Sequence, residues 1–194
     1  TKAAISVVDK FSNKNLEVQA NSVNVLGLSD FYYNGTADRK EICRLLKMAG
    51  YKINAIPGSG SSLEDLEKLG AAGLNIVCNE ELGLKLAQHL EKVFGTPYVV
   101  VGMPYGIEGT QDWLERIHKV LPCENLQAVK EEGKELLERL ISQGNDYRGV
   151  WGSLWFDNVI LAAPGTQALC MAQALRKEWA DMGELTVICQ HTVK

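Results

Sequence analysis

The sequence predicts an α/β fold, in which a parallel sheet with flanking helices is followed by a partial second β-α-β domain. Short runs rich in β-branched residues alternate with amphipathic segments between residues 23 and 121. Glycines at positions 50, 70 and 95 follow three of the amphipathic segments, where a helix commonly ends. Strands that alternate with helices are joined by crossover connections, and these place neighbouring strands parallel.

Four strand and helix pairs make up the first unit. The strands are expected at residues 23–28, 51–56, 74–78 and 97–102, and the helices at residues 38–50, within 57–70, at 80–94 and at 110–121.

Helix starts are expected at three capping positions. Asp38 with Glu41, and Ser61 with Glu64, have the three-residue spacing of a capping box. Thr110 follows a glycine-rich stretch and is expected to cap the fourth helix.

After residue 121 the pattern changes and then restarts. A charged amphipathic helix is expected within residues 122–150, with apolar residues at 136, 137, 140 and 141 on one side. A strand at 158–163, a helix at 166–182 and a strand at 185–189 then form a second unit. A single β-α-β unit supplies too little sheet to cover both of its faces.

We therefore expect an interior fragment of a longer protein, and the first residue, Thr1, is consistent with this. The expected organisation is a leader segment (1–22), a Rossmann-like middle domain (23–121), a helical connector (122–150) and the truncated start of a second Rossmann-like domain (151–194).

Composition narrows the classes of partner. The net charge is −4 and acidic and basic residues are interspersed, so no basic stripe predicts binding to nucleic acid or to an anionic membrane. No apolar run approaches the roughly 20 residues of a membrane helix, and the N-terminus lacks the apolar core of a signal peptide. We expect a soluble, cytoplasmic protein.

Ligands of an open parallel sheet bind beyond the carboxyl ends of its strands, which selects the loops at 29–37, 57–61, 78–79 and 102–109. The "GSGSS" loop at 58–62 lacks the lysine of a phosphate-binding loop, so an ordinary strand-to-helix connection is favoured there. Glu80 and Glu81 open a helix, where the helix dipole favours negative charge.

Cys78 is one of five cysteines, and these contain no C-x-x-C pair. It ends a central strand and precedes a helix, a position that favours the thiolate form that binds metal. The alternative is a buried thiol that only packs, because free cysteine is among the residues most often buried.

A succession of short motifs resembles the nitrogenase component 1 family, and together they span residues 22–190. They are "LLKMAGYKI", "LNIVC", "EKVFGTPY", "YGIEGT" and, in the second unit, "VILAAPGTQALCMAQALRKEWADMGELTVIC". The family includes nitrogenase molybdenum-iron protein subunits, a cofactor-assembly scaffold and dark-operative protochlorophyllide reductase.

The resemblance implies an oxidoreductase subunit in which Rossmann-like domains surround a metallocluster or tetrapyrrole site. It also implies an iron-sulfur cluster or iron-containing metallocluster in the parent protein, a homologous partner subunit and an ATP-dependent iron-protein reductase that donates electrons. Cysteines for the bridging cluster come from an N-terminal domain that this sequence lacks. The fragment alone is therefore expected to bind no cluster and to be inactive.

In cluster-bearing members a cysteine after the corresponding strand holds an iron of the large cofactor, which makes Cys78 the candidate metal and cofactor ligand. An ungapped match places Asn79 in the ligand position instead. A shift of one residue on a strand reverses the face of the side chain. Two other functions stay open: an assembly scaffold without catalysis, and a two-lobed module that binds a small molecule.

Overall fold

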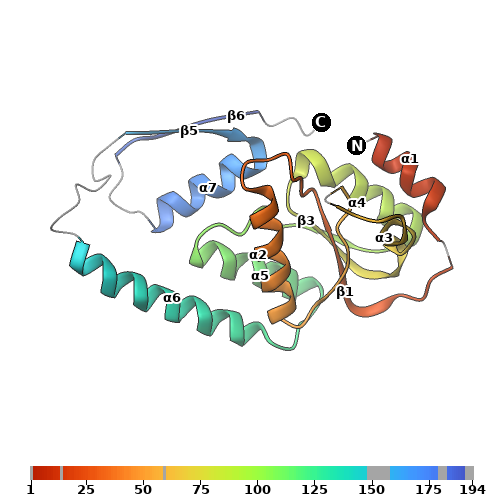
Figure 1. The fold of residues 1–194 in the computed structure, drawn as a ribbon, viewed down its shortest axis with the longest axis horizontal. Coiled ribbons are helices and arrows are strands. Elements are labelled where there is room, and N and C mark those ends of the chain that lie inside the picture. Colours follow the sequence, from red (N-terminus) through yellow and green to blue (C-terminus); the bar gives the residue numbers. More distant parts are fainter. Residues whose placement is uncertain (1, 14, 59, 148–157, 179–182, 191–194) are drawn as a thin grey trace.

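The computed structural model describes residues 2–13, 15–58, 60–147, 158–178 and 183–190. Within them a four-stranded sheet and a two-stranded sheet are flanked by helices (Figure 1). Every strand pair is parallel, which confirms the predicted α/β class. In the part of the chain that the structure describes, no helix is long and apolar enough to cross a membrane.

The first sheet has the strand order β2-β1-β3-β4. Its strands are β1 (Gln19–Leu26), β2 (Lys52–Ala55), β3 (Ala72–Val77) and β4 (Tyr98–Val100). The two central strands, β1 and β3, are buried along most of their length because helices cover both faces of the sheet. The predicted strands overlap all four, although β1 begins four residues earlier than predicted.

Helices divide between the two faces of this sheet. The helices are α1 (Lys2–Phe11), α2 (Gly35–Met48), α3 (Leu63–Glu67), the 3-10 helix η1 (Leu69–Ala71), α4 (Glu80–Phe94) and α5 (Ile107–Val120). One core lies between the sheet and α2 and α5, and the other between the sheet and α1, η1 and α4. Residues 1–22, expected as a leader, contain α1, whose Val8 is buried in the second core, and the start of β1.

Two helix starts differ from the predicted capping boxes. Helix α2 begins at Gly35 after Asn34, whose left-handed backbone (φ 60°) forms the N-cap, so Asp38 lies inside the first turn. The box of α3 is Ser62 with Asp65, one residue beyond the predicted pair. Ser61 instead donates to the carbonyl of Ile56 at 2.7 Å and shapes the loop before the helix. Both capping boxes were predicted wrongly. The backbone conformation of the preceding loop decides where each helix begins, and residue spacing in the sequence does not reveal that conformation.

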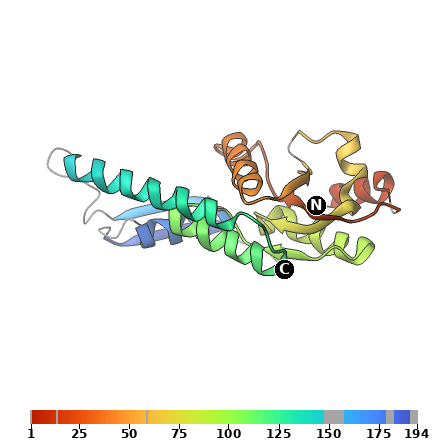
Figure 2. The ribbon, with the colours of Figure 1, turned by 90° about the horizontal axis from the view of Figure 1, so that it is seen from below.

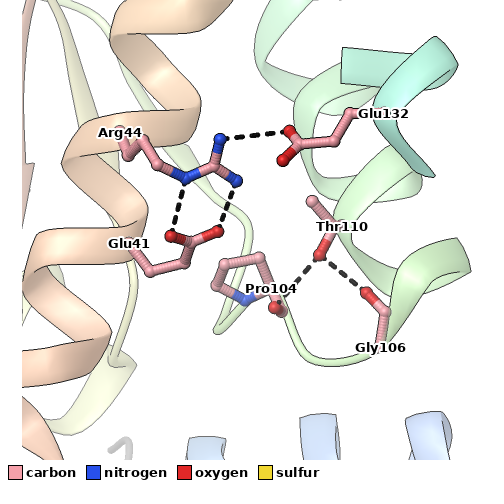
Figure 3. Close-up of polar contacts among 6 residues, drawn as sticks. All are labelled: Glu41, Arg44, Pro104, Gly106, Thr110 and Glu132. Carbon is pink, nitrogen blue, oxygen red and sulfur yellow. Dashed lines mark hydrogen bonds and ion pairs between the residues drawn. The ribbon is translucent and has the colours of Figure 1, made fainter. Parts of the chain in front are cut away.

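Thr110 is also not a cap. Helix α5 begins at Ile107 with Gly106 as N-cap, and the Thr110 hydroxyl donates back to the carbonyls of Gly106 and Pro104 (Figure 3). The loop before α5 is therefore tied to the first turn of its own helix.

The second unit follows a long helix, α6 (Leu126–Tyr147), which runs beside α5 (Figure 2). The unit consists of β5 (Val159–Pro164), α7 (Gly165–Glu178) and β6 (Leu185–Gln190). Arg44 of α2 pairs with Glu41 on its own helix and with Glu132 of α6, which joins the two helices across the groove between them (Figure 3). The predicted apolar residues of α6 (136, 137, 140 and 141) are exposed.

Three asparagines form an amide ladder across the centre of the first sheet. Asn24 donates to Asn75 at 2.9 Å and accepts from Asn54 at 2.8 Å. Asn24 also donates to the carbonyl of Leu69 at 2.9 Å, and so connects the sheet to η1. Asn24 and Asn75 are fully buried, and their hydrogen bonds satisfy polar groups that burial would otherwise penalise.

Candidate functional site

The candidate site lies at the carboxyl edge of the first sheet, where the loops after β1, β3 and β4 meet helix α7 of the second unit. Parallel strands bring these loops to the same edge, which is where open α/β sheets bind ligands. The structure thus brings the predicted loop at 102–109 together with the 29–37 loop and with residues of α7. The predicted loop at 57–61 follows the edge strand β2, and of its described residues Ser61 accepts from the Gly58 N–H and donates to the carbonyl of Ile56.

Cys78 directly follows β3 and is fully buried. Its side chain belongs to the core between the sheet and helices α2 and α5, on the same face as Leu74 and Ile76. Burial, with a smaller contribution from the thiols of Cys170 and Cys43, raises the pKa of the Cys78 thiol well above its usual range. The thiol is therefore protonated and packed against apolar groups.

Asn79 occupies the N-cap position of α4 and is 1% exposed. Its Nδ2 donates to the carbonyl of Gly27 at 2.7 Å, which ties the end of β3 to the loop after β1. The Oδ1 atom is buried and has no hydrogen-bond partner among the residues that the structure describes. Among the residues described, no three His, Cys, Asp or Glu side chains lie close enough together to hold a metal ion.

Glu81 joins the first sheet to the second unit. Its carboxylate accepts hydrogen bonds from the backbone N–H and the hydroxyl of Thr166, at 2.6 and 2.7 Å. The Thr166 hydroxyl oxygen in turn accepts from the backbone N–H of Glu80 at 3.1 Å. The carboxylate lies at the N-terminus of α7, where the helix dipole and the unpaired N–H groups favour negative charge.

Glu178 makes the reciprocal contact at the other end of α7. Its carboxylate accepts from the backbone N–H groups of Ile107 and Glu108, each at 3.0 Å, at the N-terminus of α5. Between the two ends, Cys170 accepts a hydrogen bond from the backbone N–H of Met103 at 3.3 Å. Helix α7 is thus attached to the first unit at both ends by carboxylates that accept from backbone donors.

Replacing Glu81 with alanine is expected to loosen α7. Hydrogen bonds to a charged group contribute about 1.5–3 kcal/mol, so we expect the amides of the first turn of α7 to exchange about tenfold faster or more. Hydrogen exchange followed by mass spectrometry measures this rate. The control is Glu91→Ala, which changes an exposed residue on α4, the helix that carries Glu81. Equal protection of α7 in both variants would contradict the contact.

An aromatic cavity of about 580 Å³ lies beside this contact. The loop after β1, the start of α2, the loop after β4, strand β5 and helix α7 contribute its walls. We call it the aromatic cavity, and its lining residues are Phe31, Tyr32, Tyr33, Asn34, Asp38, Tyr105, Leu161, Ala162, Ala163, Pro164, Gln167 and Met171.

A chain of hydrogen bonds forms the polar end of the aromatic cavity. The Tyr105 hydroxyl donates to Asp38 at 3.4 Å and accepts from the Gln167 side chain at 3.3 Å. Asn34 donates to the other Asp38 oxygen at 3.2 Å. Burial raises the pKa of Asp38 above its ordinary value, although the hydrogen bonds from Asn34 and Tyr105 oppose this shift. Burial and the neighbouring Asp38 carboxylate raise the pKa of Tyr105.

Sequence reasoning selected the loops at this edge but missed the residues that join the units. Glu81 was interpreted only as a helix-opening acid, and Thr166 and Gln167 were not singled out. The available signal was the glycine-rich stretch at 102–110, which allows α7 to approach closely: a Cβ at Gly102 would lie 2.5 Å from the Cys170 sulfur.

Comparison with known proteins places the chain in a family. Residues 1–177 match the family model described as nitrogenase component 1 type oxidoreductase. A light-independent protochlorophyllide reductase subunit of Huperzia lucidula is 33% identical over 166 residues, which cover 81% of this chain and 32% of the relative. The corresponding subunit of Zygnema circumcarinatum is 41% identical over 96 residues, which cover 50% of this chain and 18% of the relative.

Solved structures agree with this placement at the level of the fold. The structure described as "Nitrogenase Cp1 at pH 6.5" superposes with a TM-score of 0.74 at 19% identity, and covers 98% of this chain and 35% of that one. This chain spans about a third or less of the length of these proteins. The chain belongs to the nitrogenase component 1 type oxidoreductase family.

Proposed function

We propose that this chain is part of a nitrogenase-like oxidoreductase subunit and forms one wall of a metallocluster or tetrapyrrole site. The observation that carries the proposal is the aromatic cavity, which lies at the carboxyl edge of the sheet and is lined on one side by β5 and α7 of the second unit. Relatives named as subunits of light-independent protochlorophyllide reductase support a reductive function. In this proposal an ATP-driven iron-protein reductase supplies the electrons, and a homologous component 1 subunit completes the site.

An iron-sulfur cluster does not fit the residues around Cys78 as they stand. The thiol is protonated and packed in the core, and the adjacent Asn79 offers an amide, which is a poor ligand for iron. We therefore propose that cysteines outside this chain hold the cluster of the parent protein. Ligation by Cys78 is a separate proposal, which requires the thiol to leave the core and lose its proton.

Iron and acid-labile sulfide content, measured anaerobically on the full-length protein, tests both proposals. We expect iron in the wild-type protein, and less than half of it in Cys78→Ala if Cys78 is a ligand. Cys189→Ala is the matched control, because Cys189 is exposed on β6.

The outcomes separate the two proposals. Iron that is present and unchanged in Cys78→Ala assigns this thiol to packing and leaves the oxidoreductase proposal intact. A wild-type protein without iron overturns the proposal that the parent is a cluster-containing oxidoreductase.

A second candidate function is a two-lobed module that binds a small molecule without redox chemistry. The observation in its favour is that the aromatic cavity is lined by both β-α units. A colourless small molecule that copurifies with an iron-free full-length protein, identified by mass spectrometry, would favour this function. An assembly scaffold without catalysis would contain iron but lack reductase activity.

A further inference from the structure

We propose that Cys123 and His118 form a thiol–imidazole pair, at which Cys123 exchanges with a low-molecular-weight disulfide to give a reversible mixed disulfide. The inference goes beyond the proposed function, because the pair lies away from the candidate site and needs neither a cluster nor a reductase. Cys123 follows the end of α5, and Tyr51, which contacts it, directly precedes β2. The pair therefore lies at the amino edge of the first sheet, opposite the carboxyl edge with the aromatic cavity.

Two donors of Cys123 converge on one ring nitrogen of His118. The backbone N–H of Cys123 donates to the His118 Nδ1 atom at 3.1 Å, and the Cys123 Sγ atom lies 3.3 Å from the same nitrogen. Because Nδ1 accepts from a backbone N–H, it carries a lone pair, and the ring hydrogen is on Nε2. The thiol thus donates to a basic nitrogen that is already aimed at it. A nucleophile within hydrogen-bond reach of a base is the arrangement that activates a thiol.

The fold holds the two side chains in this arrangement. His118 lies in the last turn of α5, where the helix dipole favours a positively charged ring. Tyr51 donates its hydroxyl to the carbonyl of Leu121 at 2.6 Å, which ties the turn between His118 and Cys123 to the start of β2. Burial, followed by the hydrogen bond with Cys123, raises the pKa of Tyr51, so this hydroxyl keeps its proton. His118 therefore supplies the base for the thiol.

The Cys123 thiol is accessible to a small molecule. Cys123 is half-buried, and the residues on either side of it, Pro122 and Glu124, are exposed. Cys78, by contrast, is fully buried, and burial raises the pKa of its thiol. A small disulfide can therefore approach Cys123, whereas Cys78 is shielded by the core.

The exchange needs no reactant other than the small disulfide. The thiol proton of Cys123 passes to Nδ1 of His118, and the imidazolium then donates to the thiolate. The thiolate attacks one sulfur of the small disulfide, so that a new S–S bond to Cys123 forms while the original S–S bond breaks. The departing thiolate takes the proton from the imidazolium, and the products are the mixed disulfide and one free small thiol. A second small thiol reverses the reaction by the same route.

Oxidised glutathione added to the full-length protein tests the proposal, and peptide mass spectrometry reads each cysteine separately. We expect Cys123 to be modified at least tenfold faster than Cys43, because the thiolate is the reacting form. Cys43 is the matched thiol, since it is also half-buried and burial raises its pKa. His118→Ala is expected to slow the reaction at Cys123 at least tenfold and to change that at the exposed Cys189 less than twofold.

His118→Asn separates the loss of the base from a loss of structure. The asparagine Oδ1 atom takes roughly the place of Nδ1 and still accepts from the backbone N–H of Cys123, but an amide takes up no proton. We therefore expect His118→Asn to slow the reaction at Cys123 as much as His118→Ala does. Its unfolding midpoint should stay close to that of the wild type, and this variant decides the result if His118→Ala fails to fold.

Three outcomes would overturn the proposal. Equal rates at Cys123 in the wild type and in His118→Asn would remove the imidazole from the reaction. A glutathione adduct at Cys189 but not at Cys123 would show that a disulfide does not reach this thiol. Rapid alkylation of Cys123 by iodoacetamide without a glutathione adduct would refute disulfide exchange as its chemistry. None of these results depends on iron content, so failure here is distinguishable from failure of the oxidoreductase proposal.

Discussion

Replacing Gly27 with alanine is expected to lower the free energy of unfolding by more than about 3 kcal/mol, or to prevent folding. Gly27 follows β1 with a φ of 86°, a conformation that L-residues rarely adopt. An added Cβ would lie 2.6 Å from the carbonyl oxygen of Asn79 and 2.8 Å from its nitrogen. These are backbone atoms at the start of α4, so relief requires the helix to move.

Urea denaturation followed by circular dichroism measures this loss. Gly109→Ala is the control, because Gly109 lies in α5 with no atom within 4 Å of an added Cβ. Alanine is the better helix former, so the control should gain about 0.5–1 kcal/mol. If the free energy of unfolding of Gly27→Ala lay within about 1 kcal/mol of the wild-type value, the close approach of the β1 loop to α4 would be wrong.

Replacing Asn24 with alanine is expected to lower the free energy of unfolding by about 2–4 kcal/mol. The change removes the donor to Leu69 and Asn75 and the acceptor for Asn54. The Leu69 carbonyl loses this partner, as does the buried Asn75 side-chain oxygen. A buried polar atom that loses its partner retains its full desolvation cost, which is why the loss exceeds that of an exposed hydrogen bond.

Asn15→Ala, on an exposed residue, provides the comparison in the same urea experiment. The slope of the transition should stay constant, because the change alters stability and not the surface exposed on unfolding. A loss in Asn24→Ala no larger than in Asn15→Ala would show that the amide ladder does not stabilise the sheet.

The strands and most helices could be predicted from the sequence because their signal is local. Val23, Val25 and Leu26 marked β1, and Leu74, Ile76 and Val77 marked β3. Gly95, with its left-handed φ of 73°, ends α4 where it was predicted. The first residue of each helix was harder to predict. Asn34 caps α2 through a left-handed conformation that no spacing rule reveals, and the α3 box differs by a single residue.

The candidate site was predictable in location but not in composition. The carboxyl edge follows from parallel topology, so the loops at 29–37 and 102–109 were selected correctly as part of this edge. Glu81 and Thr166 are 85 residues apart, and only tertiary structure brings them together. The orientation of Cys78 depends on the pleat of β3, in which residues 74, 76 and 78 share one face.

The attachment of α7 at both ends has a consequence for how this protein can vary. The donors at Ile107 and Glu108 are backbone N–H groups, and so is one of those at Thr166, which any residue except proline supplies. The side chains at these donor positions can therefore be substituted while the backbone hydrogen bonds that orient the two units are kept. Two acidic side chains, Glu81 and Glu178, one from each unit, therefore carry a large share of that orientation, together with side-chain contacts such as Lys177 with Asp112 at 2.9 Å.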